Sequence, residues 1–372
     1  MLTSLTVRGF KTLRDLTLRL SPVTVLLGAN NVGKTNVVRA IELLAHAVRL
    51  GSLPRAVAEA GEDVRTRGDG GGRLFFKVEG QLDGRRFSYE VSDSTEEVRI
   101  LEPDGFEAKR GSDGKFHLGA AGLLSSGDNR DPGAGLAALA GSPKPAPELE
   151  KDVAFMKRIA SFLGGMRAAD FSPARLREPS LPSPEVTLGR EGENLAAVLD
   201  RLQGERPLVR RRIDEEVRKA IPSVDLVTTV AQAQGHKVVG VAEGDLVFNS
   251  ADLSDGILLF IALSTVTQMS GGSTLVALEE VERGIHPRRI RDTLDQVLRV
   301  SRTGSQFLLT THSPLLLNEF RELPEAVIVL ERSGDGTSAR QLSELPDLEA
   351  ALKDVSLGDL WYSGVLGGVP AA

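Results

Sequence analysis

The chain has 372 residues, of which 41% are hydrophobic, and a formal net charge of -6 at pH 7. This mildly acidic balance argues against a protein that coats nucleic acid through bulk charge, and the absence of cysteine excludes disulfides and thiolate metal sites. We see no secretory signal at the start, and the longest apolar run, residues 257–263, is too short to cross a bilayer. We therefore expect a cytoplasmic protein without a membrane partner.

The first part of the chain predicts short strands, a glycine-rich turn and a helix. Residues 2–7 and 16–20 alternate apolar with other residues, and residues 23–27 are almost continuously apolar, as in a strand that is buried on both faces. Apolar residues then recur at helical spacing over 37–48. A glycine turn between a strand and a helix is the arrangement that phosphate binding requires, because the helix start directs backbone N–H groups at the anion.

The turn itself has the composition of a phosphate loop. Lys34 supplies a positive charge for the β- and γ-phosphates of ATP, and the hydroxyl of Thr35 is a ligand for Mg²⁺. The residues that we predict to contact the nucleotide here are Gly28, Ala29, Asn30, Asn31, Val32, Gly33, Lys34, Thr35 and Asn36.

The middle of the chain is less regular. Residues 51–72 are predicted to form a loop, and residues 119–147 have the composition of a linker. Helices are predicted at 148–163 and 195–221, and they are interrupted by prolines that include Pro207. Antiparallel strands are predicted at 73–78, 86–91, 98–101, 226–230 and 237–242.

A cluster of arginines at 210–212 is the best candidate for a local basic patch. Asp214, Glu215 and Glu216 follow it directly. Two interpretations therefore stay open: a surface that binds phosphates, or a solvated helix face on which the opposite charges mix.

Two acids follow the apolar strand predicted at 275–278. Such a strand delivers its carboxylates to the edge of the sheet beside the phosphate loop. There Glu279 would hold magnesium, directly or through water, and Glu280 would orient and deprotonate the attacking water. The alternative is a pair of surface acids at the end of a strand.

Two further features flank this pair. His312 follows the strand predicted at 307–310, where a histidine can hydrogen-bond a γ-phosphate, although a lone histidine is more often structural. Ser254 opens the helix predicted at 256–269 together with Gly256. Ser254 is a good N-cap, and the same geometry makes an anion site that could act across a dimer.

The order of these motifs resembles that of the ABC-type ATPase heads. The similarity is to the RecF- and SMC-like branch, and within it to bacterial AAA ATPases related to the overcoming-lysogenization-defect proteins. It covers nearly the whole chain and is weakest over 50–225. The segments that carry it, beside the phosphate loop, are RGFK at 8–11, LSDG at 253–256, EEVERGIHP at 279–287, THSP at 311–314 and LGDLW at 357–361.

This resemblance implies an α/β P-loop NTPase of the ABC-ATPase type, with a mostly parallel core sheet, an antiparallel β subdomain and an inserted helical lid. It implies one composite ATPase domain: an N-terminal lobe at 1–147, the lid at 148–222 and a C-terminal lobe at 223–372. It also implies a homodimer in which ATP and Mg²⁺ join two heads, with Ser254 and Gly256 in the signature, residues 282–286 in the D-loop and His312 as the switch histidine.

The sequence departs from that pattern at three positions. Asp255 stands where the first of two signature glycines is usual, and an acid near a γ-phosphate is expected to weaken closure of the dimer. Glu279 stands where many relatives have aspartate, and Val281 where proline is commoner. No glutamine can be assigned to the Q-loop.

Three functional classes remain open. The first is an ATP-driven switch in DNA repair, DNA maintenance or anti-phage defence, with DNA as a candidate partner. The second is an ATPase that regulates a separately encoded nuclease or toxin effector. A nuclease within this sequence is not expected, because 60 residues follow His312 (372 minus 312) without a DxD pair. A transporter ATPase is less favoured, because 220 positions separate Lys34 from Ser254 (254 minus 34) and strands are predicted between them.

Overall fold

A computed structural model describes residues 1–61, 64–66, 73–102, 106–110, 116–118, 122–123, 136, 150–184, 187–270 and 274–367 of the chain. Most of the linker predicted at 119–147 and part of the loop predicted at 51–72 lie outside the described residues.

A mostly parallel sheet forms the centre of the molecule, with the strand order β10-β14-β15-β3-β16-β17. All neighbours in it pair in parallel except the antiparallel hairpin β16–β17. Every residue of β3, β14 and β15 is buried, which explains why their sequences are largely apolar without alternation. The strands are β3 (Val23–Leu27), β10 (Arg167–Ala169), β14 (Leu275–Leu278), β15 (Gln306–Thr311), β16 (Val327–Ser333) and β17 (Gly336–Gln341).

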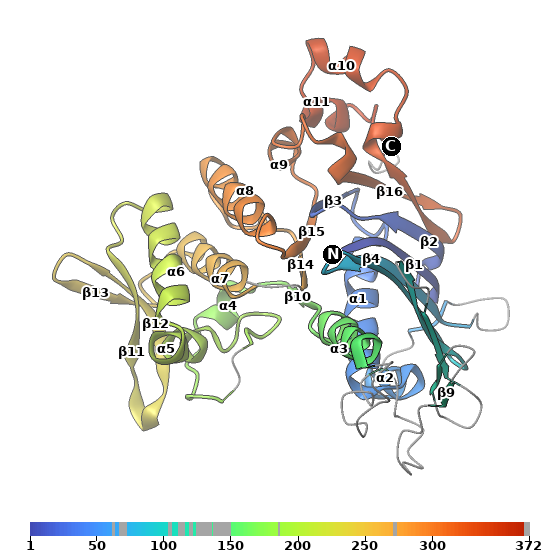
Figure 1. Cartoon of the computed structure of the whole chain (residues 1–372). Coiled ribbons are helices and arrows are strands. Elements are labelled where there is room, and N and C mark those ends of the chain that lie inside the picture. Colours follow the sequence, from blue (N-terminus) through green and yellow to red (C-terminus); the bar gives the residue numbers. More distant parts are fainter. Residues whose placement is uncertain are drawn as a thin grey trace.

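Alternation of side chains across this sheet divides the apolar interior into two cores. Val25 and Leu309 face a core that they share with α7 (Asp255–Met269) and α8 (Pro287–Ser301). Leu26 and Leu308 face the opposite core, which contains α1 (Lys34–Leu50) and α3 (Glu150–Gly164). Figure 1 shows these two helix pairs on opposite sides of β14 and β15. The predicted α/β class with a mostly parallel core sheet is confirmed.

A second, antiparallel sheet packs against the α1 side, with the order β2-β1-β4-β5-β6-β7-β8-β9. It confirms the predicted antiparallel β subdomain. Its strands are β1 (Leu2–Phe10), β2 (Leu13–Arg19), β4 (Phe75–Leu82), β5 (Arg85–Ser92), β6 (Glu96–Glu102), β7 (Phe106–Arg110), β8 (Phe116–Leu118) and β9 (Gly122–Leu123).

The prediction of a loop at 51–72 is wrong for α2 (Leu53–Glu59). Ser52 caps this helix by accepting a hydrogen bond from the Arg55 N–H at 3.3 Å, and Leu53 and Ala56 are buried. Two turns are too short to give a clear helical period in the sequence, so the surrounding glycines and charges dominated the prediction.

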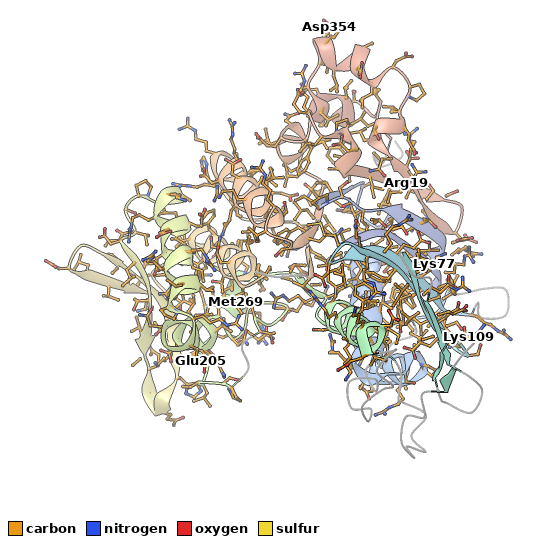
Figure 2. The ribbon with its side chains drawn as sticks, in the orientation of Figure 1. Arg19, Lys77, Lys109, Glu205, Met269 and Asp354 are labelled. Atoms are coloured by element: carbon orange, nitrogen blue, oxygen red, sulfur yellow. The ribbon has the colours of Figure 1, made fainter. Side chains whose placement is uncertain are left out.

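A distal lobe joins α5 (Leu195–Glu205) and α6 (Pro207–Ala220) to a small sheet of β11 (Leu226–Ala231), β12 (Lys237–Glu243) and β13 (Leu246–Asn249). The helix predicted at 195–221 is interrupted at Pro207, as the sequence suggested. Within the range predicted as a lid, α3 lies beside α1, whereas α5 and α6 lie in the distal lobe (Figure 1). Figure 2 labels Glu205, the last residue of α5, in this lobe.

Neither interpretation of the arginine cluster holds for Arg210. Its guanidinium is buried and donates a hydrogen bond to Asp214 at 3.0 Å, so it belongs to the interior of the distal lobe. Arg211 and Arg212 are exposed, and Arg211 pairs with Glu215, as on a solvated helix face.

The C-terminal residues form more structure than the predicted hairpin and tail. The hairpin is flanked by α9 (Pro314–Asn318), α10 (Leu348–Asp354) and α11 (Leu357–Tyr362). Leu348, Leu357 and Leu360 are buried in the core that faces α7 and α8, so α10 and α11 pack onto the rest of the molecule. In the described part of the chain, no helix combines the length and the apolarity needed to span a bilayer.

Candidate functional site

The phosphate loop connects β3 to α1 at the carboxyl edge of the core sheet. Gly33 is the N-cap of α1 and has φ 113°, a conformation that favours glycine. A Cβ atom at this position would lie 2.4 Å from the Thr337 hydroxyl. Because glycine has no side chain to accept from the first-turn N–H groups, the start of α1 keeps these donors for an anion.

The side chains of two threonines and one asparagine support the phosphate loop. The Thr337 hydroxyl donates to the Val32 carbonyl at 2.8 Å and lies 2.8 Å from the Thr12 hydroxyl. The Asn36 amide donates to the same Thr12 hydroxyl at 2.9 Å. The β1–β2 turn and β17 therefore hold the loop in place, a role for Thr12 and Thr337 that the sequence analysis missed.

Lys34 lies across the loop with its ammonium group directed at backbone oxygens. It is 7% exposed and donates to the carbonyls of Gly28 and Ala29. Burial lowers the pKa of Lys34, and the charges of Glu280, Glu282 and Glu279 oppose that shift. The arrangement places a desolvated cation where a phosphate chain would enter the loop.

Glu279 meets the phosphate loop through Thr35. The Thr35 hydroxyl donates to Glu279 Oε2 at 2.7 Å. Burial raises the pKa of Glu279, and the Thr35 hydrogen bond and the Arg190 charge oppose that rise. A hydroxyl and a carboxylate beside a phosphate cradle are the oxygen ligands that suit Mg²⁺, which completes its shell with phosphates and water.

Arg190 connects this pair to α1 and was not identified from the sequence. Its guanidinium contacts Glu279 Oε1 and, through the other nitrogen, Glu42 Oε2. Its carbonyl accepts from the Asp170 N–H at 2.8 Å. Arg190 also lines a cavity of about 390 Å³ along α1. Its lining also includes Phe10, Lys11, Arg39, His46 and Val64.

Thr310 holds the backbone of Glu280, and Arg283 holds its side chain. Glu280 has φ 44°, and its N–H donates to the Thr310 hydroxyl at 3.0 Å. Arg283 donates to Glu280 Oε2 at 2.9 Å and to Asp170 at 2.7 Å. Asp170 follows β10, the strand beside β14, so it marks the end of the neighbouring strand at the same edge.

His312 lies beside Glu280 but does not hydrogen-bond it directly. Its Nδ1 is 4.0 Å from Glu280 Oε1, longer than a hydrogen bond. The His312 N–H and the Thr311 hydroxyl both donate to Glu282 Oε1, at 3.2 and 2.9 Å. The structure thus brings together the side chains of Lys34, Thr35, Glu279, Glu280 and His312.

Ser254 and Gly256 lie at the start of α7, apart from this group. Ser254 accepts from the Ile257 N–H at 3.4 Å, so the N-cap interpretation is supported. A Cβ atom at Gly256 would lie 3.0 Å from the Gly284 carbonyl. The close packing of this carbonyl therefore favours glycine at position 256. Among the described residues, no hydrogen bond joins Ser254 to the phosphate loop of the same chain.

Comparisons with known proteins identify the family and the fold of the chain. A family model described as "AAA domain, putative AbiEii toxin, Type IV TA system" matches residues 23–318. A search of curated protein sequences finds no significant match.

Two solved structures of Smc heads share the fold. The SmcHead bound to the C-winged helix domain of ScpA has 12% identity and a TM-score of 0.54, with 92% of this chain and 99% of that chain covered. The Smc head with an extended coiled coil bound to the C-terminal domain of ScpA, from Pyrococcus furiosus, has 11% identity and a TM-score of 0.50, with 95% and 99% covered.

Proposed function

We propose that this chain binds Mg-ATP and hydrolyses it as a head-to-head dimer. The chain belongs to the AAA-domain family whose model it matches, and it is an ABC/SMC-like P-loop ATPase head. The observation that carries the proposal is the meeting of Lys34, Thr35, Glu279, Glu280 and His312 at one edge of the core sheet. The division into two lobes and an inserted lid stays part of this proposal.

Each side chain has a task that its position supports. Lys34 and the N–H groups at the start of α1 bind the phosphates. Thr35 and Glu279 hold Mg²⁺, which supplies positive charge against the phosphate oxygens. Glu280, oriented by Arg283, accepts the proton of the attacking water, and His312 holds the other side of that water or the γ-phosphate.

A second copy of the chain completes the site in this proposal. Among the described residues, no hydrogen bond joins the helix start at Ser254 and Gly256 to the phosphate loop of the same chain, so its N–H groups are not used by that loop. Paired head to head, each copy would present this helix start to the nucleotide of the other, where its N–H groups suit a γ-phosphate.

The decisive experiment is the molar mass of the Glu280→Gln protein by light scattering, with and without Mg-ATP. The substitution removes the base and leaves the phosphate loop intact, so we expect ATP to convert a monomer into a stable dimer. Adding Ser254→Arg to the same protein should prevent pairing while each monomer still binds ATP. A Glu280→Gln protein that hydrolyses ATP at the wild-type rate would contradict the role of Glu280.

For the biological role we propose an ATP-driven switch in DNA repair, DNA maintenance or anti-phage defence. The alternative, control of a separately encoded nuclease or toxin effector, is favoured by the description of the matching family, which names a toxin. The ATPase rate with and without duplex DNA separates the two: stimulation by DNA supports the switch, and a rate insensitive to DNA supports the effector.

A further inference from the structure

Asp255 is the first residue of α7 and poses a problem for the proposed dimer. A carboxylate in the first turn stabilises the helix itself, because it complements the partial positive charge of the helix start. It also opposes the approach of any other anion to the same N–H groups. Asp255 is 59% exposed, so its charge is accessible at the helix start that, in the proposed dimer, would receive a nucleotide phosphate of a second head.

Arg177 meets this charge from another part of the chain. Its Nη1 lies 2.7 Å from Asp255 Oδ1. The same guanidinium donates to the Leu253 carbonyl at 2.8 Å and to the Pro173 carbonyl at 3.2 Å. Two backbone oxygens therefore hold the cation at a fixed place beside the helix start.

The backbone of Arg177 is held as well. Its carbonyl accepts from the Ser250 hydroxyl at 3.2 Å, in the turn that leads to α7. Arg177 ends α4 (Pro173–Leu176), the short helix that follows β10 and Asp170. The residue thus belongs to the segment that connects the edge of the core sheet with the signature helix.

We propose that Arg177 is a positioning residue that neutralises Asp255 and so keeps the start of α7 able to receive the phosphates of a second head. This inference rests on the proposed function. An ion pair this exposed adds little to folding stability, since Arg177 is 31% and Asp255 59% exposed. Its consequence lies in the local charge: with the pair intact, Ser254 and Gly256 present a helix start without net negative charge.

The test uses the full-length Glu280→Gln protein with Mg-ATP and measures the dimer dissociation constant by light scattering over a concentration series. Arg177→Gln should weaken pairing by about tenfold or more, because it leaves Asp255 as an uncompensated like charge at the interface. Glutamine removes the charge and keeps a polar side chain, but it is shorter than arginine, so loss of charge must be separated from loss of contacts by a rescue experiment. Arg177→Lys should preserve pairing.

Rescue separates a charge effect from a structural one. Asp255→Gly alone should not weaken pairing, and Asp255→Gly combined with Arg177→Gln should restore it to within about threefold of the parent protein. ATP binding by monomers of every variant should stay unchanged. Raising the salt concentration should reduce the defect of Arg177→Gln, since the repulsion is screened.

Two results would overturn the role of Arg177: unweakened pairing of Arg177→Gln, or failure of Asp255→Gly to rescue it. A parent Glu280→Gln protein that never dimerises would overturn the proposed function first and this inference with it. If Arg177→Gln does not fold, Arg177→Met takes its place: weakened pairing that Asp255→Gly restores supports the role of Arg177, and unweakened pairing overturns it.

Discussion

The phosphate-loop edge and the distal lobe both bury charged side chains, but they do so in opposite ways. In the distal lobe, Arg210 and Asp214 face each other at 3.0 Å, and both bond the backbone of Val227 in β11. At the phosphate-loop edge, Lys34 and Glu279 are buried without facing each other: Lys34 donates to carbonyls, and Glu279 accepts from Thr35 and Arg190.

The difference distinguishes a structural ion pair from a ligand site. The charges of the distal pair are neutralised within one turn of α6, so this cluster has no need of a ligand. In the described part of the chain near the phosphate loop, the Lys34 ammonium donates only to backbone carbonyls, and the charges of three glutamates act on its pKa without a direct ion pair. The buried Glu282 Oε2 has no hydrogen-bond partner among the described residues. Lys34, unlike Arg210, is therefore a buried cation to which no carboxylate that the structure describes is hydrogen-bonded, which leaves its charge available to a ligand.

The largest expected effect is on the distal pair. Arg210→Ala should lower the free energy of unfolding by about 3–5 kcal/mol, because it leaves Asp214 buried without its cation. Urea unfolding of the nucleotide-free protein measures it. The matched control is Arg211→Ala on the exposed face of the same helix, which should change stability by less than about 0.5 kcal/mol. Equal effects of the two substitutions would break the comparison.

Lys34→Ala tests the other region and should act on binding. We expect ATP affinity to fall by about a hundredfold or more, because a charge-assisted contact to the phosphates is lost. The protein should remain folded, as judged by thermal unfolding without nucleotide. Isothermal titration calorimetry with ATP measures the affinity, with the exposed Lys353→Ala as control. Unchanged ATP binding would contradict the phosphate-loop assignment.

Glu279→Gln should have the smallest effect, and it should stabilise the nucleotide-free protein, whereas Arg210→Ala destabilises it. Burial raises the pKa of Glu279 above its ordinary 4.5. The stability that this carboxyl contributes is therefore present below pH 4.5 and lost as the pH rises through the folded-state pKa. We expect the nucleotide-free Gln variant to be more stable than the wild type at neutral pH, with the difference shrinking toward pH 4.5.

Thermal unfolding of both proteins over this pH range measures the difference. A Gln variant that is less stable than the wild type at neutral pH would show that the Thr35 and Arg190 contacts outweigh the burial of the charge. In that case Glu279 would resemble Asp214 of the distal lobe, whose buried charge is stabilised by the partner Arg210.

The sequence by itself determined the parallel core and the identity of the residues at its edge. Gly28 and Glu279 directly follow apolar strands, and Thr311 is the last residue of a third. The residues of the site are therefore next to these strands in the sequence. Parallel strands bring those ends to one edge, so local patterns were sufficient to predict where these side chains meet.

Only the tertiary structure decided the partners of these residues. Arg190 is 148 positions from Glu42 and 89 from Glu279, and Arg177 is 78 positions from Asp255 (255 minus 177). Thr12 and Thr337 meet across 325 positions. No local period marks such residues, because their contacts depend on how distant segments cross. For the same reason, the sequence did not predict that Arg210 is buried. Its charge is evident from the sequence, but its burial depends on the packing of β11 against α6.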